Sequence, residues 1–503
     1  MTTANSSIHP GRSRVAEKPR ADANRNLLKV LKPVYNKMLQ AEAQKEGIIN
    51  AVGSRNHKSA VNLVDYMALR SFNIEPIQEE LHRCGLSSLA SSESHIKFQL
   101  LQVMGWLGDD AAGASEVDYD GGIKLLRDNI TALLGEADDG AVPPIMVTFD
   151  TNFAEDPELI CDLLKNGMKL ARINCAHDDE DTWIKMIDNL QKARIQTGLP
   201  CKIYMDIAGP KIRAQVVGKG KHRNKLKVEP GQEILLSEPG RKAEKGQVFI
   251  RCTLPGIVQY LKKGQRVLID DGLFESVVTE TAGDEALIKI IRISSGKAVI
   301  KSEKGLNFPD TEFEINPVTK YDIKCLPFIT RHADMLGFSF VTSAADMQLL
   351  RSRLETLGCP DFPVIAKIET GLAVNNLPDI ILQGMKQQKF GVMVARGDLA
   401  IEIGFERMSE IQDEILWICE AAHVPAIWAT QVLETMNKRG IATRGEITDA
   451  VHAASADCVM LNKGEHILEV LRTLNNILAR SRKNSFKNRR LFRKLSIAEK
   501  FLE

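Results

Sequence analysis

Residues 391–402 read GVMVARGDLAIE, an apolar run that ends at Arg396, Gly397 and Asp398. Upstream, residues 363–369 read PVIAKIE, in which Lys367 and Glu369 follow a second apolar run. A lysine and two acids at the carboxyl ends of two parallel strands are the side chains from which proteins build a divalent-metal site facing an anionic substrate. The two stretches therefore place the chemistry of this chain at the ends of buried strands.

Short apolar runs of this kind recur from residue 145 onward, and amphipathic helical stretches fill the gaps between them. Eight runs are present, at 145–149, 170–174, 202–206, 335–340, 364–368, 391–395, 425–429 and 458–462. Eight strand-helix units in succession predict an α/β fold of the (β/α)8 TIM barrel type.

One connection between the predicted strands is too long to be a loop. Residues 211–306 are rich in glycine, lysine and alternating β-formers, with little helical period. A segment of this length with strands of its own predicts a β-rich lid domain inserted after the third barrel strand. Upstream, apolar residues recur at helical spacing, which predicts an α-helical N-terminal extension. The expected divisions are a disordered tail (1–26), the helical region (27–142), the first part of the barrel (143–210), the lid (211–306), the second part of the barrel (307–482) and a basic C-terminal tail (483–503).

Composition excludes several classes of partner and location. The net charge of +1 gives no field that would attract nucleic acid or a membrane surface. No apolar run reaches the roughly 20 residues of a membrane span, and residues 1–26 lack the apolar core of a secretory signal, which leaves a disordered tail or an organelle transit peptide. The nine cysteines form no CxxC pair, which favours reduced thiols in a cytoplasmic protein. The basic tail is interpreted as a solvated end rather than a nucleic-acid arm.

Five predicted strands end in polar or charged residues. In a barrel of this type the carboxyl ends of the strands form one mouth, where catalytic groups gather. Ionic pairing for stability explains any single pair of these residues but explains the whole set poorly. The residues are Arg172 and Asn174, Asp206, Lys367 and Glu369, Arg396 and Asp398, and Thr430 and Gln431.

These residue types suit phosphoryl or carboxylate chemistry. Glu369 and Asp398 fit a hard cation such as Mg²⁺ or Mn²⁺, while Arg172 and Lys367 can hold an anionic group and stabilise charge that develops on it. Glycine at position 397 would let an anionic substrate approach the backbone. The hydroxyl of residue 430 either orients a proton or water, or is a satisfied hydroxyl at a strand end, and the spacing leaves both interpretations open.

A set of ordered motifs resembles the pyruvate kinase family. They include ARINCAHD (171–178), MDIAGPKIR (205–213), KGLNFPD (304–310), AKIETG (366–371), MVARGDLAIEIG (393–404), WATQVLETM (428–436) and CVMLNKGE (458–465). The resemblance runs from about 145 to 480 and implies the same barrel, interrupted after its third strand by a β-rich lid.

The resemblance implies transfer of the phosphoryl group of phosphoenolpyruvate to ADP, giving pyruvate and ATP, with Mg²⁺ or Mn²⁺ as cofactor and a homo-oligomeric, cytoplasmic enzyme. By motif, Glu369 and Asp398 would bind the metal, Lys367 would stabilise the transferring phosphoryl group and the enolate, and Arg172 and Arg213 would contact phosphate. Gly397 and Asp398 would lie at the substrate, and Thr430 on the path of enolate protonation. Asn174, His177 and Arg213 would lie near the nucleotide, and Asp271 of the lid would close over the site and exclude water.

The chain departs from the family at the monovalent-cation site. The family typically uses an Asn, a Ser, an Asp and a Thr carbonyl there, with a Glu close by. Asn174 and Asp206 remain, but Ala176, Ile207 and Lys211 replace the other three side chains. We therefore expect Lys211 to supply the positive charge beside Asn174 and Asp206, so that potassium is not required.

Three other departures bear on activity and regulation. The first strand ends in TFDTN (148–152), the eighth is followed by LNKGEHI (461–467), and the family's C-terminal effector domain has no counterpart, so regulation by fructose 1,6-bisphosphate is not expected. The added helices could serve assembly, regulator binding or barrel stability. Two alternative functions are a magnesium-dependent lyase or decarboxylase of oxo-acids, since a metal-enolate barrel suits that chemistry, and a catalytically weakened regulatory homologue.

Overall fold

The computed structural model describes residues 17–109, 113–136, 142–218, 224–242, 247–294, 296, 298–482, 485–487 and 489–490. The chain divides into two compact units, the first ending at Leu125 and the second beginning at Leu126. This division lies inside a helix and before the predicted boundary at residue 142. Within the described residues, no helix is long and apolar enough to cross a membrane.

The first unit is helical. It contains α1 (Glu17–Ala51), α2 (Gly53–Arg70), α3 (Glu75–Arg83), α4 (Ile96–Trp106) and the start of α5 (Tyr119–Leu134). Because α1 begins at Glu17, the expectation of a disordered tail is wrong for residues 17–26, where a polar segment lacks the apolar spacing that reveals a helix. Residues 1–16 lie outside the described part of the chain. In the core of the unit Lys97 pairs with Asp65 at 3.2 Å, and burial raises the pKa of that acid to about 8.

The second unit is built on a closed barrel of eight parallel strands, and every one of the eight predicted strands is confirmed. Their side chains are almost entirely buried, which is why each one reads as a continuous apolar run. The strands, in their order around the barrel, are β1 (Ile145–Thr148), β2 (Met168–Asn174), β3 (Lys202–Asp206), β13 (Met335–Phe338), β14 (Val364–Ile368), β15 (Phe390–Ala395), β16 (Ala426–Ala429) and β17 (Cys458–Leu461).

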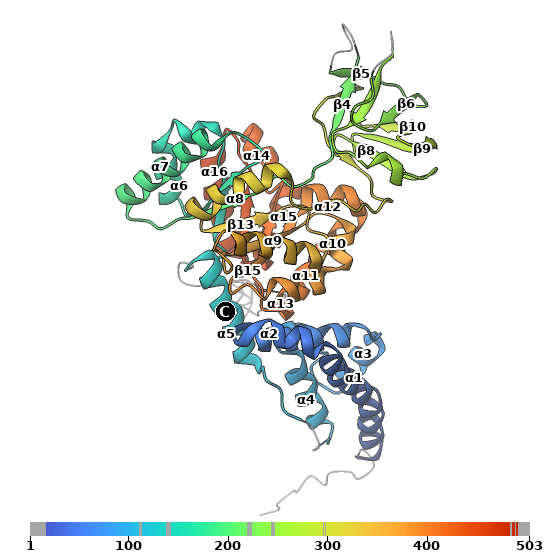
Figure 1. Cartoon of the computed structure of the whole chain (residues 1–503). Helices are drawn as coiled ribbons and strands as arrows, with labels where there is room; N and C mark the ends of the chain where they lie inside the picture. Colours follow the sequence, from blue (N-terminus) through green and yellow to red (C-terminus); the bar gives the residue numbers. More distant parts are fainter. Residues whose placement is uncertain are drawn as a thin grey trace, which may run out of the picture. The chain divides into compact units, whose positions relative to one another are not determined.

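Helices follow the strands and surround the barrel (Figure 1). Three of them begin with a capping box, in which a Thr or Ser side chain and an acid three residues later satisfy each other's backbone amides; these are α8, α9 and α15. The helices are α6 (Pro157–Lys165), α7 (Glu180–Thr197), α8 (Lys320–His332), α9 (Ala344–Thr356), α10 (Gly371–Asn375), α11 (Leu377–Gly384), α12 (Arg396–Ile403), α13 (Met408–Ala421), α14 (Glu434–Arg439), α15 (Arg444–His452) and α16 (Ile467–Arg482).

The C-terminal end of α5 closes the floor of the barrel, at the amino ends of the strands. Leu133 and Leu134 pack into the apolar layer that includes Met146, Leu170 and Met393. Lys202, the first residue of β3, donates to the carbonyls of Ala132 and Leu133 at 3.2 and 2.8 Å. This lysine therefore caps the last turn of α5, where carbonyls have no partner within the helix.

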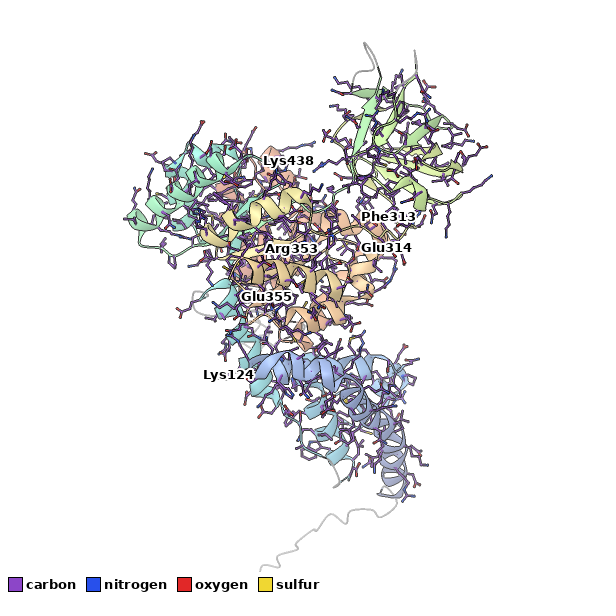
Figure 2. The ribbon with its side chains drawn as sticks, viewed as in Figure 1. Lys124, Phe313, Glu314, Arg353, Glu355 and Lys438 are labelled. Carbon is purple, nitrogen blue, oxygen red and sulfur yellow. The ribbon has the colours of Figure 1, made fainter. Side chains whose placement is uncertain are left out.

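The insertion after β3 is a β-rich lid with a core of its own, and its strands gather in a separate body in Figure 1. Seven strands form one sheet in the order β12-β8-β9-β10-β6-β7-β4, and β11 pairs with β5. Beyond residue 306 the chain still packs on this core: Phe313, labelled in Figure 2, lies edge-on to Phe308 with ring centroids 5.4 Å apart. The strands are β4 (Ala214–Val217), β5 (Lys225–Lys227), β6 (Glu233–Ser237), β7 (Phe249–Cys252), β8 (Arg266–Ile269), β9 (Phe274–Ala282), β10 (Glu285–Ile293), β11 (Val299–Lys301) and β12 (Leu306–Asn307).

A hydrogen bond joins the root of the lid to the barrel. The Asn307 amide donates to Oε1 of Glu402, on α12, at 2.8 Å. Burial raises the pKa of Glu402 to about 7, because the carboxylate loses most of its hydration. Repulsion by the negative charge of Asp398 contributes to this rise. A cavity of about 350 Å³, lined in part by both residues of this bond, lies beside it.

A substitution at Gly337 can test how tightly the strands that carry the site are packed. It lies opposite Asp206 in the β13–β3 register, and a Cβ at this position would overlap the Tyr204 hydroxyl. We expect Gly337→Ala to destabilise the protein by roughly 1–3 kcal/mol through overpacking, measured as a lower midpoint of urea unfolding. The control is Gly445→Ala on α15, where no atom lies within 4 Å and helix propensity predicts a gain of up to about 1 kcal/mol. Equal midpoints for the two variants would show that the packing argument is wrong.

The raised pKa of Glu402 predicts that the free energy of unfolding depends on pH. Its pKa is about 7 in the folded protein against 4.5 for a free glutamate, so the folded state retains a proton that the unfolded state releases, and stability falls as pH rises from 4.5 through 7. Glu402→Gln keeps an acceptor for Asn307 and removes the titration, so its advantage over wild type should grow toward pH 8, to roughly 3 kcal/mol as an upper bound. Urea unfolding with EDTA at pH 5 and 8 measures this change. The matched control, Glu280→Gln at an exposed position of β9, should show the wild-type pH dependence; parallel profiles for all three proteins would contradict the prediction.

Candidate functional site

Four charged side chains form one chain of ion pairs at the carboxyl ends of β2, β3 and β14. Arg172 contacts Asp206 at 2.8 Å, Lys367 contacts the same Asp206 oxygen at 3.1 Å, and Lys367 contacts Glu369 at 3.1 Å. Asp206, Lys367 and Glu369 are 0%, 8% and 3% exposed. The structure thus brings four of the predicted site residues into a single charged cluster, which consists of Arg172, Asp206, Lys367 and Glu369.

The ends of neighbouring strands position this cluster. The β2–β3 register places Asn174 opposite Asp206, and the Lys367 ammonium donates to the Ser339 hydroxyl at 2.7 Å. The backbone amide of Phe340 donates to Glu369 at 2.6 Å. Sequence reasoning missed both residues of the β13 end, although a serine directly after the apolar run MLGF was a usable signal for the first of them.

The charges of the cluster stabilise one another. Burial alone would raise the pKa of Asp206, but the charges of Arg172 and Lys367 outweigh it and lower that pKa. Burial would likewise lower the pKa of Lys367, but Glu369 and Asp206 raise it. Both groups therefore carry their charges at neutral pH, and the ammonium remains a permanent cation in a site shielded from water.

Glu369 differs from the other members of the cluster. Burial, together with the like charge of Asp398, raises its pKa despite the neighbouring Lys367. A cation bound between two carboxylates would relieve this repulsion. Among the described residues no group of three or more His, Cys, Asp or Glu side chains is placed to hold a metal. Mg²⁺ needs only one or two carboxylates because substrate oxygens and water complete its shell, so this pair fits such an ion.

Lys211 contacts a different partner from the one expected. Its ammonium lies 2.7 Å from Oδ1 of Asp398, whereas the ion pairs of Asp206 are with Arg172 and Lys367. The chain leaves β3 through Gly209, whose φ of 67° is in the left-handed region that favours glycine. The turn redirects the following residues, so that the lysine charge lies at a predicted metal ligand rather than at the pair Asn174 and Asp206.

The loop after β16 holds Thr430 against the first turn of α12. Its φ of 67° is unusual for a β-branched residue, and its hydroxyl accepts a hydrogen bond from the Gly397 amide at 2.8 Å. An accepting hydroxyl keeps its own O–H as a donor. Arg396, by contrast, is an anchor: its guanidinium lies 4.4 Å from the Trp428 ring centroid and donates to the Thr430 carbonyl at 2.7 Å.

A cavity of about 600 Å³ opens at this mouth. Four predicted site residues share it, and they are Arg172, Asn174, His177 and Thr430. Sequence reasoning did not assign a role to five further charged residues that also line it, which are Asp178, Glu434, Lys438, Lys463 and Glu465. Partial burial of the ring and the charge of Lys463 lower the pKa of His177.

The two predicted lid residues lie apart from the charged cluster. Arg213 donates to the Glu303 carbonyl at 2.9 Å, and its charge contributes to the lowered pKa of His177. Asp271 lies in the turn after β8, beside Gly305. In the part of the chain that the structure describes, neither residue forms an ion pair with the charged cluster.

Known proteins match the barrel and the lid together. A family model described as the barrel domain of pyruvate kinase matches residues 135–467. The crystal structure of a pyruvate kinase from Cryptosporidium parvum matches with a TM-score of 0.61 and 26% identity, over 70% of this chain and 70% of that chain.

Curated relatives agree with this match. The pyruvate kinase of Chlamydia muridarum is 31% identical over 338 residues, which are 65% of this chain and 66% of the relative. That of Bacillus licheniformis is 30% identical over 65% of this chain and 55% of the relative. The chain thus spans between half and two thirds of the length of these relatives. Since the family model covers more than half of the chain and spans the whole charged cluster, this protein belongs to the pyruvate kinase family.

Proposed function

We propose that this protein transfers the phosphoryl group of phosphoenolpyruvate to ADP, giving pyruvate and ATP. The observation that carries the proposal is the charged cluster, in which the cations Arg172 and Lys367 are both paired with Asp206. Phosphoryl transfer depends almost entirely on positioning and on electrostatic stabilisation of the transferring group. The cluster supports both requirements because its charges are fixed by ion pairs and shielded from water.

Glu369 and Asp398 would hold Mg²⁺ or Mn²⁺. When bound, the ion would neutralise charge on the substrate oxygens and help to orient them. The raised pKa of Glu369 beside Asp398 supports this assignment, because two neighbouring acids are most stable with a cation present. Gly397, between the strand end and Asp398, offers an approach for the substrate carboxylate.

Lys367 and Arg172 would act on the reacting groups. The buried ammonium of Lys367 would stabilise charge on the phosphoryl group and on the enolate that it leaves, and the guanidinium would contact phosphate. Asp206 contacts both cations and would therefore orient them. The Thr430 O–H would provide the proton path to the enolate.

The nucleotide would occupy the cavity at the mouth. Asn174 and His177 line this cavity, and Arg213 and Asp271 would approach it from the lid and exclude water. An oxo-acid lyase requires no second phosphate-binding cation, so Arg172 and Arg213 favour phosphoryl transfer over that alternative. A weakened homologue would not need Lys367, Glu369, Asp398 and Thr430 together, and all four are present.

The proposal extends to the surroundings of the enzyme. We propose a cytoplasmic homo-oligomer that binds neither nucleic acid nor membranes. The net charge of +1 supports it, because no strong field draws the protein to a polyanion.

A coupled assay of pyruvate formation tests the activity. We expect turnover that requires phosphoenolpyruvate, ADP and Mg²⁺ together, and Lys367→Met should lower kcat by at least about 100-fold because a preorganised charge in a dry site is lost. Lys192→Met, at an exposed position of α7 outside both the charged cluster and the cavity, is the control and should retain most of the kcat. Circular dichroism confirms that each variant is folded.

Other outcomes of this assay would support the alternatives. Consumption of oxaloacetate without ADP would favour the lyase. No turnover of the folded wild-type protein with any of these substrates would favour the regulatory homologue.

The potassium requirement is tested in buffers free of both sodium and potassium. If Lys211 supplies the charge, the wild type should be fully active there and potassium should add little. Lys211→Met should lose activity and regain part of it with potassium, because the added ion restores a positive charge near Asp398. Strong activation of the wild type by potassium would contradict the hypothesis that Lys211 replaces this ion.

A further inference from the structure

Two lysines line the 600 Å³ cavity together with Arg172 of the charged cluster. Lys438 lies on α14 and is labelled in Figure 2, and Lys463 lies in the loop after β17. The segment 461–467, in which Lys463 stands, departs from the family pattern. The family assignment therefore gives this lysine no role.

The two lysines differ in their partners. The Lys438 ammonium pairs with Oε1 of Glu434 at 2.6 Å, and Oε2 of the same acid accepts from the Asn462 amide at 3.0 Å. Both oxygens of Glu434 are thus engaged. Within the described residues Lys463 has no ion pair, so its charge is available to an anion in the cavity.

The loop that carries Lys463 is fixed in place. Buried Asn437 donates to the Asn462 carbonyl at 2.7 Å, and the Asn437 carbonyl accepts from the His466 amide at 3.2 Å. A side chain at Gly464 would overlap Asn437. These contacts hold the backbone on both sides of Lys463, so the side chain starts from a fixed position in the cavity wall.

The charge of the cluster shows why a further cation is useful there. Arg172 and Lys367 are balanced by Asp206 and Glu369, so the cluster as a whole is neutral. Lys211 is balanced by Asp398. A nucleoside diphosphate that enters the cavity brings several negative charges, which these paired cations offset only in part. Lys463 lines the same cavity as His177, and its charge helps to lower the pKa of this predicted nucleotide-binding residue.

We propose that Lys463 binds the diphosphate of the nucleotide and selects a nucleoside diphosphate over a monophosphate. The proposal rests on the proposed function, because that function places a nucleotide in this cavity. A charged hydrogen bond to the terminal phosphate would favour ADP, while AMP, which lacks that phosphate, would gain nothing from it.

Direct binding of ADP and of AMP tests the proposal without turnover. Equilibrium dialysis with each nucleotide should show that Lys463→Gln weakens ADP binding by roughly tenfold or more and leaves AMP binding unchanged. Lys463→Arg should retain ADP binding because it keeps the charge. Lys192→Gln, at an exposed position of α7 that does not line the cavity, is the control and should change neither affinity. An unchanged ratio of ADP to AMP affinity in Lys463→Gln would overturn the proposal.

Two further readouts separate this proposal from the proposed function. In the pyruvate assay, Lys463→Gln should raise the KM for ADP and leave that for phosphoenolpyruvate unchanged; equal rises in both would overturn the proposal. In an NMR titration, the pKa of His177 should rise in Lys463→Gln and not in Lys192→Gln, because the charge of Lys463 lowers that pKa. If wild type binds ADP through Lys463 but shows no turnover, the proposed function fails and the diphosphate site stands.

Discussion

The buried chain of alternating charges at the barrel mouth is the constraint on which the rest of the site depends. Asp206 contacts two cations, and Lys367 contacts two acids. The desolvation of each charge is offset only by its neighbours, so removing one leaves a buried charge without compensation. The strands that carry these residues must therefore keep one register, and the precision of the site follows from the stability of the barrel.

Much of the fold could be predicted because the barrel strands are buried on both faces. Runs such as VIAKI and GVMVA have no polar alternation, and the polar residues that follow them mark the strand ends. Short strands of the lid were harder: β5 has three residues and β12 has two, too few for a period of two to appear. In the site, Lys367 and Glu369 were predictable from their position, whereas the Phe340 amide that fixes Glu369 is a backbone group and leaves no trace in the sequence.

Position in a motif did not fix the direction of a side chain. Lys211 was expected beside Asn174 and Asp206, yet it contacts Asp398 because a turn with a positive φ separates it from β3. Arg396 follows β15 as directly as Asp398 does, but it lies over Trp428 and anchors the Thr430 loop. Both outcomes depend on contacts between segments far apart in the chain, which spacing alone does not contain.

The floor of the barrel is supplied by a helix that precedes all eight strands. Leu133 and Leu134 therefore leave the ribosome before β1, and long before β17 pairs with β1 to close the barrel. The nascent strands can therefore pack on the apolar residues of α5 as they emerge, instead of leaving their amino ends open to other chains. A protein that lacks α5 would expose Met146, Leu170 and Met393 together, an apolar patch of the kind that drives self-association. The order of elements along the chain thus protects the open end of the barrel while it is being made.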